Sequence, residues 1–319
     1  MLNPEPNSLC FETADRTEFP AALNLVFGRS DAAQRERQIA TAIEEIERAG
    51  EDGSVVLVAR RNRLMVAAIW VQIQPGSIAS LWPPGLVSGE PDATALTLIE
   101  LAAAKAHAAG ARFLQSLLET DADGPALWLR LCNFQHCTDL LYLVSPREVF
   151  PNLPPTTQLQ FEPCCDLPER MARLSAIVQQ TYESTQDCQF VQGLRSIDDV
   201  LAGYKAVGIY DASRWFLVIQ SEGEGNIRDV GCLLLTEHPA EKNCELIYFG
   251  VVPLARGARL GIEIVRQAQW LTRQSRAERL VLAVDAANSP AIAVYAAAGF
   301  EAWDRRSVFL RKLETPSQC

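Results

Sequence analysis

The stretch Glu245–Gly261, ELIYFGVVPLARGARLG, contains the residue types of an anion-binding turn. Its apolar first part predicts a strand, Pro253 ends the strand, and a turn with two arginines and two glycines leads into a long amphipathic helix. A helix N-terminus offers backbone N–H groups without intrahelical partners at the positive end of its dipole. The stretch therefore predicts a phosphate or pyrophosphate site, although it is neither a G-x-x-x-x-G-K-[ST] loop nor a G-x-G-x-x-G loop.

The stretch Val284–Phe300, VDAANSPAIAVYAAAGF, predicts a short helix with one side chain capable of proton transfer. Asn288 or the serine after it caps the helix, Pro290 lies in its first turn, and a glycine ends it. Tyr295 lies in the middle of this helix among alanines. Taken alone, such a tyrosine indicates an amphipathic core residue, so the case for chemistry depends on the two stretches together.

Together the two stretches resemble the GNAT superfamily of acyl-CoA N-acyltransferases. The resemblance covers roughly residues 160–319 and rests on V-x-P-x-x-R-G-x-x-x-G at Val251–Gly261, followed by N-x-P-A-x-x-x-Y-x-x-x-G-F at Asn288–Phe300. It implies that acetyl-CoA is the co-substrate. It also implies that the acetyl group moves directly to a primary amine of a small molecule or protein.

The resemblance assigns site residues as well. The turn amides would hold the CoA pyrophosphate, which implicates Arg256, Gly257, Ala258, Arg259, Leu260 and Gly261. The preceding strand would pair with the pantetheine arm through Phe249, Gly250, Val251 and Val252. Tyr295 would be the general acid that protonates the departing thiolate, and Asn288 would hydrogen-bond the pantetheine arm or the reaction centre.

One position departs from the family's usual turn. Arg259 stands where the R-G-x-G-x-G pattern has its second glycine. A β-carbon fits at this position if the φ of the residue is negative, and the extra charge would help to bind phosphates.

The proton on the amine also needs an acceptor. An alkylamine has a pKa of about 10 in water, so a base or a desolvating pocket must remove its proton before attack. Glu245 lies where many family members carry a strand glutamate that acts directly or through water; it is equally well interpreted as a strand-edge residue facing solvent. Asp285 is a second candidate for base or amine anchor. None of the nine cysteines has a context typical of an acyl-enzyme, with Cys188 left open.

The acceptor pocket is expected at residues 182–204, YESTQDCQFVQGLRSIDDVLAGY. The four acids of this segment, which suit a cationic amine, are Glu183, Asp187, Asp198 and Asp199. For Asp198 and Asp199, helix capping and a solvated acidic face are the favoured interpretation.

Composition excludes several classes of function. The 319 residues are 48% hydrophobic and carry a formal net charge of −10, which disfavours nucleic acid and anionic membranes as partners. No apolar run reaches the roughly 18 residues of a membrane span, and the first residues lack a signal-peptide pattern, so we expect a cytoplasmic protein. Nine cysteines without C-x-x-C spacing and three histidines predict reduced thiols and no metal site.

A segment with five prolines, residues 145–163, divides the chain. Both halves read as strands followed by helix, strand, helix and strand, and ARFLQSLLETDADGPALWLRLCNF resembles ERLVLAVDAANSPAIAVYAAAGF. We therefore expect an α+β (mixed α/β) fold of two tandem GNAT-like domains, each a mostly antiparallel twisted sheet flanked by helices: a degenerate domain at residues 1–150 and a catalytic domain at residues 151–319. The first half has no arginine–glycine turn and has Arg130 in place of the tyrosine, which predicts that it binds no acetyl-CoA.

Two other hypotheses are compatible with the sequence. A non-catalytic acyl-CoA-binding regulatory module would bind CoA without turnover, whereas a protein-interaction scaffold would have no cofactor affinity and an exposed apolar patch. Tyr295 and Asn288 favour catalysis. The expected oligomeric state is a monomer or a homodimer.

Overall fold

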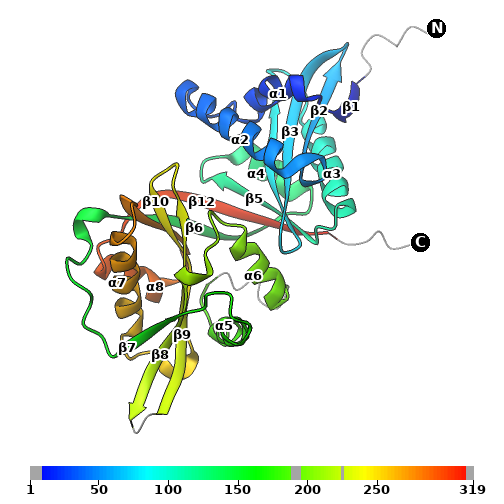
Figure 1. Cartoon of the computed structure of the whole chain (residues 1–319). Helices are drawn as coiled ribbons and strands as arrows, with labels where there is room; N and C mark the ends of the chain where they lie inside the picture. The colour runs from blue at the N-terminus through cyan, green and yellow to red at the C-terminus, as the bar shows by residue number, and fades with distance from the viewer. Residues whose placement is uncertain (1–8, 188–194, 224–225, 314–319) are drawn as a thin grey trace, which may run out of the picture. The chain divides into compact units, whose positions relative to one another are not determined.

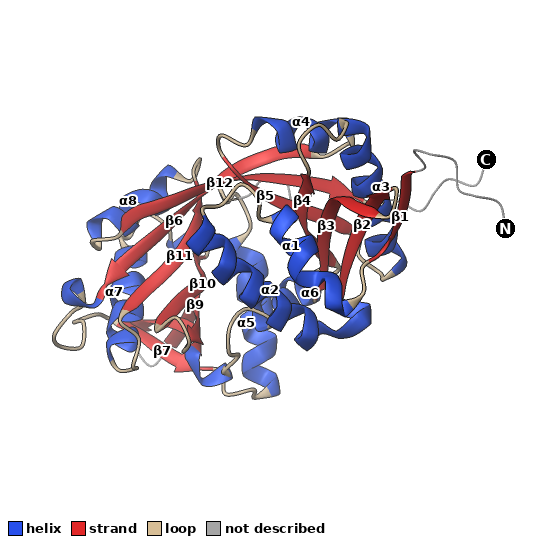
Figure 2. Ribbon diagram, turned by 90° about the horizontal axis from the view of Figure 1, so that it is seen from above, coloured by secondary structure: helices blue, strands red, loops and turns tan. Residues whose placement is uncertain are grey.

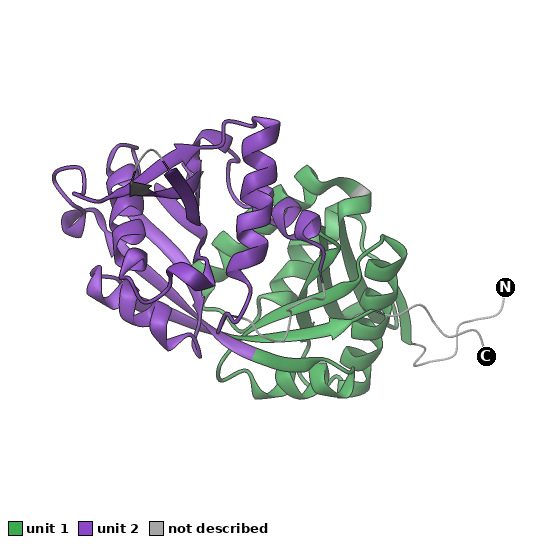
Figure 3. Ribbon diagram, turned by 90° about the horizontal axis from the view of Figure 1, so that it is seen from below, with its two compact units in different colours: residues 1–137, 307–319 green, residues 138–306 purple. Residues whose placement is uncertain are grey.

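The computed structural model describes residues 9–187, 195–223 and 226–313. Two compact units make up the chain: unit 1 comprises residues 1–137 and 307–319, and unit 2 comprises residues 138–306 (Figure 3). These units do not follow the expected division at residues 150 and 151, because the last strand of each sequence half is divided between them.

Unit 2 contains a mostly antiparallel sheet with helices on both faces (Figure 1). Its strands follow the spatial order β12-β6-β11-β10-β9-β8-β7. In chain order the elements are β6 (Gln135–Pro146), β7 (Leu159–Pro163), α5 (Pro168–Thr181), α6 (Ile197–Lys205), β8 (Trp215–Gly223), β9 (Asn226–His238), β10 (Asn243–Val251), α7 (Leu260–Arg273), β11 (Arg279–Asp285), α8 (Ser289–Ala297) and β12 (Glu301–Lys312).

Unit 1 repeats this plan with the strand order β1-β2-β3-β4-β5-β12 (Figure 2). Its elements are β1 (Leu9–Thr13), α1 (Phe19–Val26), α2 (Ala32–Gly53), β2 (Ser54–Arg61), β3 (Leu64–Gln74), β4 (Ile78–Leu86), α3 (Asp92–Ala108), β5 (Phe113–Glu119) and α4 (Asp123–Leu131). In each unit one parallel pair, β4 with β5 or β10 with β11, interrupts the antiparallel pattern.

The two sequence repeats exchange their last strands. β6 ends the first repeat, but its residues from Leu140 to Pro146 pair with β11 of the second. β12 ends the second repeat, but Phe309 is buried in the unit 1 core and the Leu313 amide donates to the Arg112 carbonyl at 2.8 Å. Each unit is therefore completed by a strand that the other half of the sequence encodes.

Helix pairs cover the two faces of the unit 2 sheet, with α7 and α8 on one face and α5 and α6 on the other (Figure 1). The buried side chains of α5 recur at the spacing of one helix face: Leu174, Ile177, Val178 and Thr181. On α7 the stripe consists of Leu260, Ile264, Val265, Ala268, Gln269 and Thr272. The core thus lies between each helix pair and the central strands β9 and β10.

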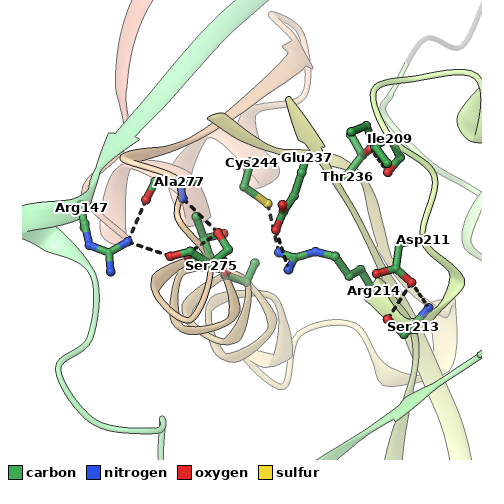
Figure 4. A network of polar contacts seen from close by, with 12 residues as sticks. Arg147, Ile209, Asp211, Ser213, Arg214, Thr236, Glu237, Cys244, Ser275 and Ala277 are labelled. Atoms are coloured by element: carbon green, nitrogen blue, oxygen red, sulfur yellow. Dashed lines mark hydrogen bonds and ion pairs between the residues drawn. The ribbon is translucent and has the colours of Figure 1, made fainter. Parts of the chain in front are cut away.

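The C-terminal end of α7 is fixed by Arg147, which follows β6 (Figure 4). Its guanidinium donates to the Ala277 carbonyl at 2.7 Å, to the Arg273 carbonyl at 2.8 Å and to the Ser275 carbonyl at 3.3 Å. A cation at the negative end of a helix dipole is favourable, and these bonds satisfy carbonyls without intrahelical partners. The C-terminal end of α7 is thereby held in place beside the segment that follows β6.

The expected fold class is confirmed, since each unit has a mostly antiparallel sheet flanked by helices. Among the described helices, none combines the length and the apolar character that a membrane span requires.

Candidate active site

Strands β10 and β11 separate along their length and open a gap in the unit 2 sheet. They pair only from Asn243–Glu245 to Arg279–Val281, after which β10 continues along β9 and β11 continues along β6. A bulge at Ile247 accompanies the separation. One backbone edge of each strand therefore faces the gap without a strand partner.

A cavity of about 470 Å³ lies at this gap. Its walls come from β10, β11, α8, the turn before α7 and the loop after α5. The cavity is lined by Thr181, Ser184, Thr185, Gln186, Asp187, Leu246, Ile247, Tyr248, Phe249, Gly250, Val251, Ala255, Arg256, Gly257, Arg259, Leu260, Gly261, Ala283, Val284, Asn288, Pro290, Ala291, Val294 and Tyr295.

Most of the residues expected to bind CoA line this cavity, with two exceptions. Val252 is buried and donates its amide to the Val230 carbonyl at 3.0 Å, so this amide is not available to a ligand. Ala258 lies in the turn but does not line the cavity. The Arg256 amide is also occupied, since it donates to the Pro253 carbonyl at 3.2 Å.

The amides that follow in the turn are open. Among the described residues, no hydrogen bond uses the backbone N–H groups of Gly257, Ala258 or Arg259. Leu260 and Gly261 begin α7, where helical geometry leaves the N–H groups without acceptors. The turn thus offers consecutive donors at the positive end of a helix dipole.

Arg259 keeps a backbone conformation typical of glycine. Its φ of 60° and ψ of 15° are left-handed, so the condition of a negative φ, under which a β-carbon fits easily, is not met. This conformation costs a residue with a β-carbon about 1–2 kcal/mol, and Arg259 tolerates it because the neighbouring turn and helix fix the backbone. The turn therefore has a left-handed residue at this position although that residue is an arginine.

Arg256 holds the turn against α5 with its side chain. Its guanidinium donates to the Thr181 carbonyl at 2.8 Å, to the Ser184 carbonyl at 3.2 Å and to the Val251 carbonyl at 3.0 Å. These bonds join the C-terminal end of α5, the end of β10 and the turn. The charge of Arg256 is thus used to position backbone that lines the cavity.

Tyr295 is buried in the wall of the cavity, where its ring packs edge-on against Phe249 and tilted against Phe300. Burial raises the pKa of Tyr295 well above its usual value, and the nearby Asp187 carboxyl raises this pKa further. Its hydroxyl therefore remains protonated at neutral pH and is able to donate a proton.

Asn288 caps α8. Its side-chain oxygen accepts from the Ala291 amide at 3.2 Å, and its NH₂ group is the part that hydrogen-bonds the Asp187 carboxyl group, which lines the same cavity.

Three tyrosines with stacked or edge-on rings form a cluster on the α5 side of β10: Tyr182, Tyr204 and Tyr248. The Tyr182 and Tyr204 hydroxyls lie 2.7 Å apart, and the Tyr248 hydroxyl lies 2.8 Å from that of Thr181. Burial raises the pKa of Tyr182 to about 12 and that of Tyr248 well above its ordinary value. No motif in the sequence selects these rings, because tyrosines in helix and strand patterns usually mark ordinary core packing.

The two expected bases are both outside the lining of the cavity. Oε2 of Glu245 lies 2.7 Å from Nε2 of His238, and this hydrogen bond raises the pKa of His238. Asp285 is buried and accepts from the Thr138 hydroxyl and, at 2.8 Å, from the Ala287 amide. Both carboxylates are therefore occupied by neighbouring groups.

Of the acids expected near the acceptor, only Asp187 lines the cavity. Ser196 caps α6 through the Asp199 amide, as the capping interpretation predicts, and Asp198 is exposed. Cys188 lies outside the described residues. Burial raises the pKa of the Cys232 thiol to about 12, which makes it a poor nucleophile. The described residues contain no cluster of potential metal ligands.

Comparison with known proteins agrees with this geometry. The model of the Acetyltransferase (GNAT) family matches residues 170–300. A curated mycothiol acetyltransferase from Saccharomonospora viridis is 36% identical over 99 residues, which are 29% of this chain and 31% of that protein. The match thus spans about a third of the curated relative's length.

Solved structures are similar to nearly the whole chain. A GCN5-related N-acetyltransferase from Sphaerobacter thermophilus has a TM-score of 0.64 and 16% identity, and the match covers 98% of this chain and 97% of that one. A tandem GNAT protein from the clavulanic acid biosynthesis pathway has a TM-score of 0.56 and 13% identity, and the match covers 97% of this chain and 100% of that one. At such identities these likenesses concern the fold alone. The family match, which includes the turn, the gap and the tyrosine described above, identifies residues 170–300 as an acetyltransferase domain of the GNAT family.

Proposed function

We propose that unit 2 transfers an acetyl group from acetyl-CoA to the amine of a cationic acceptor. The observation that carries this proposal is a single cavity lined both by residues of the turn before α7 and by Tyr295. Anion-binding donors and a proton donor in one cavity are what transfer from a phosphate-bearing thioester requires.

The residues present fit acetyl-CoA. The amides of Gly257 to Gly261 suit a pyrophosphate, and no β-carbon at Gly257 obstructs the approach to this turn. The unpaired edge of β10 at Phe249–Val251 offers backbone groups to the two amides of a pantetheine arm. When bound, acetyl-CoA supplies an acetyl thioester that an unprotonated amine can attack.

The chain's own residues then have distinct roles. Tyr295 donates a proton to the leaving sulfur, and its raised pKa keeps it protonated until that step. Asn288 orients the arm or the acceptor with its side-chain NH₂ group. The hydrogen bonds of Arg256 hold α5, the end of β10 and the turn, which form walls of the cavity, in fixed relative positions.

In unit 1, protein side chains occupy the places that correspond to the open turn amides and the strand gap of unit 2. Glu90, whose side chain is 4% exposed, accepts from Thr94 in the first turn of α3 and pairs with Arg61 at 2.8 Å. Beyond the parallel pairing of β4 with β5, the Ser116 hydroxyl donates to the Leu81 carbonyl at 2.8 Å. A carboxylate at the helix N-terminus repels phosphate, so this proposal includes one acetyl-CoA site per chain.

Calorimetric titration of the full chain with acetyl-CoA tests the proposal. We expect one site per chain with a Kd in the micromolar range, about −8 kcal/mol. Gly257 and Gly89 are matched, because both have left-handed φ (82° and 83°) and a β-carbon added to either would meet no neighbour within 4 Å. Gly257→Glu should weaken binding at least about 100-fold by placing a carboxylate at the turn, whereas Gly89→Glu should not change it. No heat with the unmodified protein, or equal loss in both variants, would contradict the proposal.

A further inference from the structure

Asp187 reaches into the gap between β10 and β11 from the loop that follows α5. The Asn288 side chain hydrogen-bonds its carboxyl group, and so does a backbone group of Asp285 at the end of β11. The Asp187 amide donates to the Thr185 hydroxyl at 3.1 Å, which fixes the loop locally. The carboxyl group is therefore held at the place where the two strands have separated.

The charge of the Asp187 carboxyl acts on the tyrosines that line or flank the cavity. Burial raises the pKa values of Tyr295, Tyr182, Tyr204 and Tyr248, and the charge of Asp187 raises each of them further. Its own pKa is raised, first by burial and then by the charge of Asp285. No ion pair among the described residues uses Asp187.

This environment favours a cation. A partly buried carboxylate without an ion-pair partner is unfavourable, and an incoming ammonium group relieves that cost. Tyr248 and Tyr295 line the same cavity, and a tyrosine ring attracts a cation through its face. The cavity is thus complementary to a protonated amine on the side where Tyr295 can reach the reacting atoms.

Glu245 is less suited to this role. It is paired with His238, and neither residue lines the cavity. To act as a base it would first have to leave this pair, whereas Asp187 is already in the cavity.

We propose that Asp187 is the catalytic carboxylate that binds the acceptor ammonium and accepts its proton. This inference rests on the proposed acetyl transfer and names a carboxylate that differs from the strand glutamate. The acceptor class is a primary amine that is cationic in solution.

The protons and electrons of the step balance. Asp187 accepts one proton from the ammonium group and passes it to water. The freed nitrogen lone pair forms the bond to the acetyl carbon while the carbon–sulfur bond breaks. Tyr295 gives its proton to the sulfur and regains one from the acetylated nitrogen, which leaves as a neutral amide. One proton is released to water for each acetyl group transferred.

The test compares three isosteric variants of the full chain: Asp187→Asn, Glu245→Gln and the exposed control Glu183→Gln. Thiol release from acetyl-CoA is followed with putrescine, glucosamine, alaninamide and benzylamine as probes, and acetyl-CoA affinity is measured by calorimetry. We expect Asp187→Asn to lower kcat/KM for the reactive probes by about 10²–10⁴-fold and to change the Kd of acetyl-CoA less than about threefold. Glu245→Gln and Glu183→Gln should stay within about fivefold of the unmodified protein.

Two results overturn the inference alone while acetyl-CoA still binds. One is an Asp187→Asn variant that keeps its kcat/KM while Glu245→Gln loses it. The other is a kcat/KM that stays the same in all three variants as in the unmodified protein. Absence of acetyl-CoA binding to the unmodified protein would overturn the proposed function as well, so the two failures are distinguishable.

Discussion

At the scale of single residues, chemistry in this protein depends on surroundings more than on residue type. Tyr295 and Asp187 share one cavity, and burial raises the pKa of each. Glu245 and Asp285 are chemically equivalent carboxylates, but their neighbours occupy them. The same two residue types, tyrosine and carboxylate, thus serve packing in one place and are available for proton transfer in another.

Tyr295→Phe tests the general acid. The variant keeps the ring that packs on Phe249 and loses only the hydroxyl, so we expect kcat to fall by about 10²–10⁴-fold while the calorimetric Kd of acetyl-CoA stays nearly unchanged. Because the pKa of Tyr295 lies far above neutrality, this tyrosine should cause no loss of activity between pH 7 and pH 9 in the unmodified protein. A variant with full turnover would remove Tyr295 from the mechanism.

Arg259 allows charge and backbone strain to be separated. Arg259→Ala removes the charge and keeps a β-carbon at φ 60°, whereas Arg259→Gly removes both. We expect the glycine variant to be more stable than the alanine variant by about 1 kcal/mol in urea unfolding, and the two to lose equal acetyl-CoA affinity. Equal stability of the two variants would mean that the turn stores no strain at this position.

At the scale of elements, the site exists because two strands separate and a helix packs closely at that point. β10 leaves β11 after Glu245, and α5 lies directly over Gly250. A β-carbon at Gly250 would come within 2.6 Å of the Thr181 β-carbon. The carbonyl of the same Thr181 accepts from Arg256, so helix position and turn position are coupled.

Gly250→Ala should therefore push α5 away from β10. We expect a loss of about 1–3 kcal/mol in the free energy of unfolding, as for an overpacked core, together with weaker acetyl-CoA binding. Gly124→Ala is the control, since a β-carbon added there would meet no atom within 4 Å and alanine is favoured in a helix. If urea denaturation shows the two variants to be equally stable, the close approach of α5 is not what requires glycine.

At the scale of the whole chain, the two sequence repeats and the two compact units do not coincide. Leu143 of the first repeat is buried in the unit 2 core, and Phe309 of the second repeat is buried in the unit 1 core. Neither half of the sequence therefore encodes a complete core, and separation at residue 150 would leave both sheets without a strand.

Because the last strands are exchanged, truncating a core side chain in the last strand of one repeat should destabilise the unit that is formed mainly by the other repeat. Phe309→Ala should cost about 3–5 kcal/mol and reduce hydrogen-exchange protection in β2, β3 and β5 of unit 1. Leu143→Ala should instead reduce protection in β8 to β11 of unit 2. Loss of protection in β8 to β11 from Phe309→Ala would refute the division into these units.

The sequence by itself determined the fold class, the duplication, the turn before α7 and the position of Tyr295, because each depends on local spacing and on residue types that act over a few positions. Only the tertiary structure decided that Asp187 enters the cavity, that His238 occupies Glu245 and that the last strands are exchanged. The strand exchange and the place of Asp187 depend on contacts between residues far apart in the chain, whereas His238 and Glu245, seven residues apart, meet through the pairing of β9 with β10. The left-handed φ of Arg259 belongs with them, since an arginine takes that conformation only where the surrounding fold imposes it.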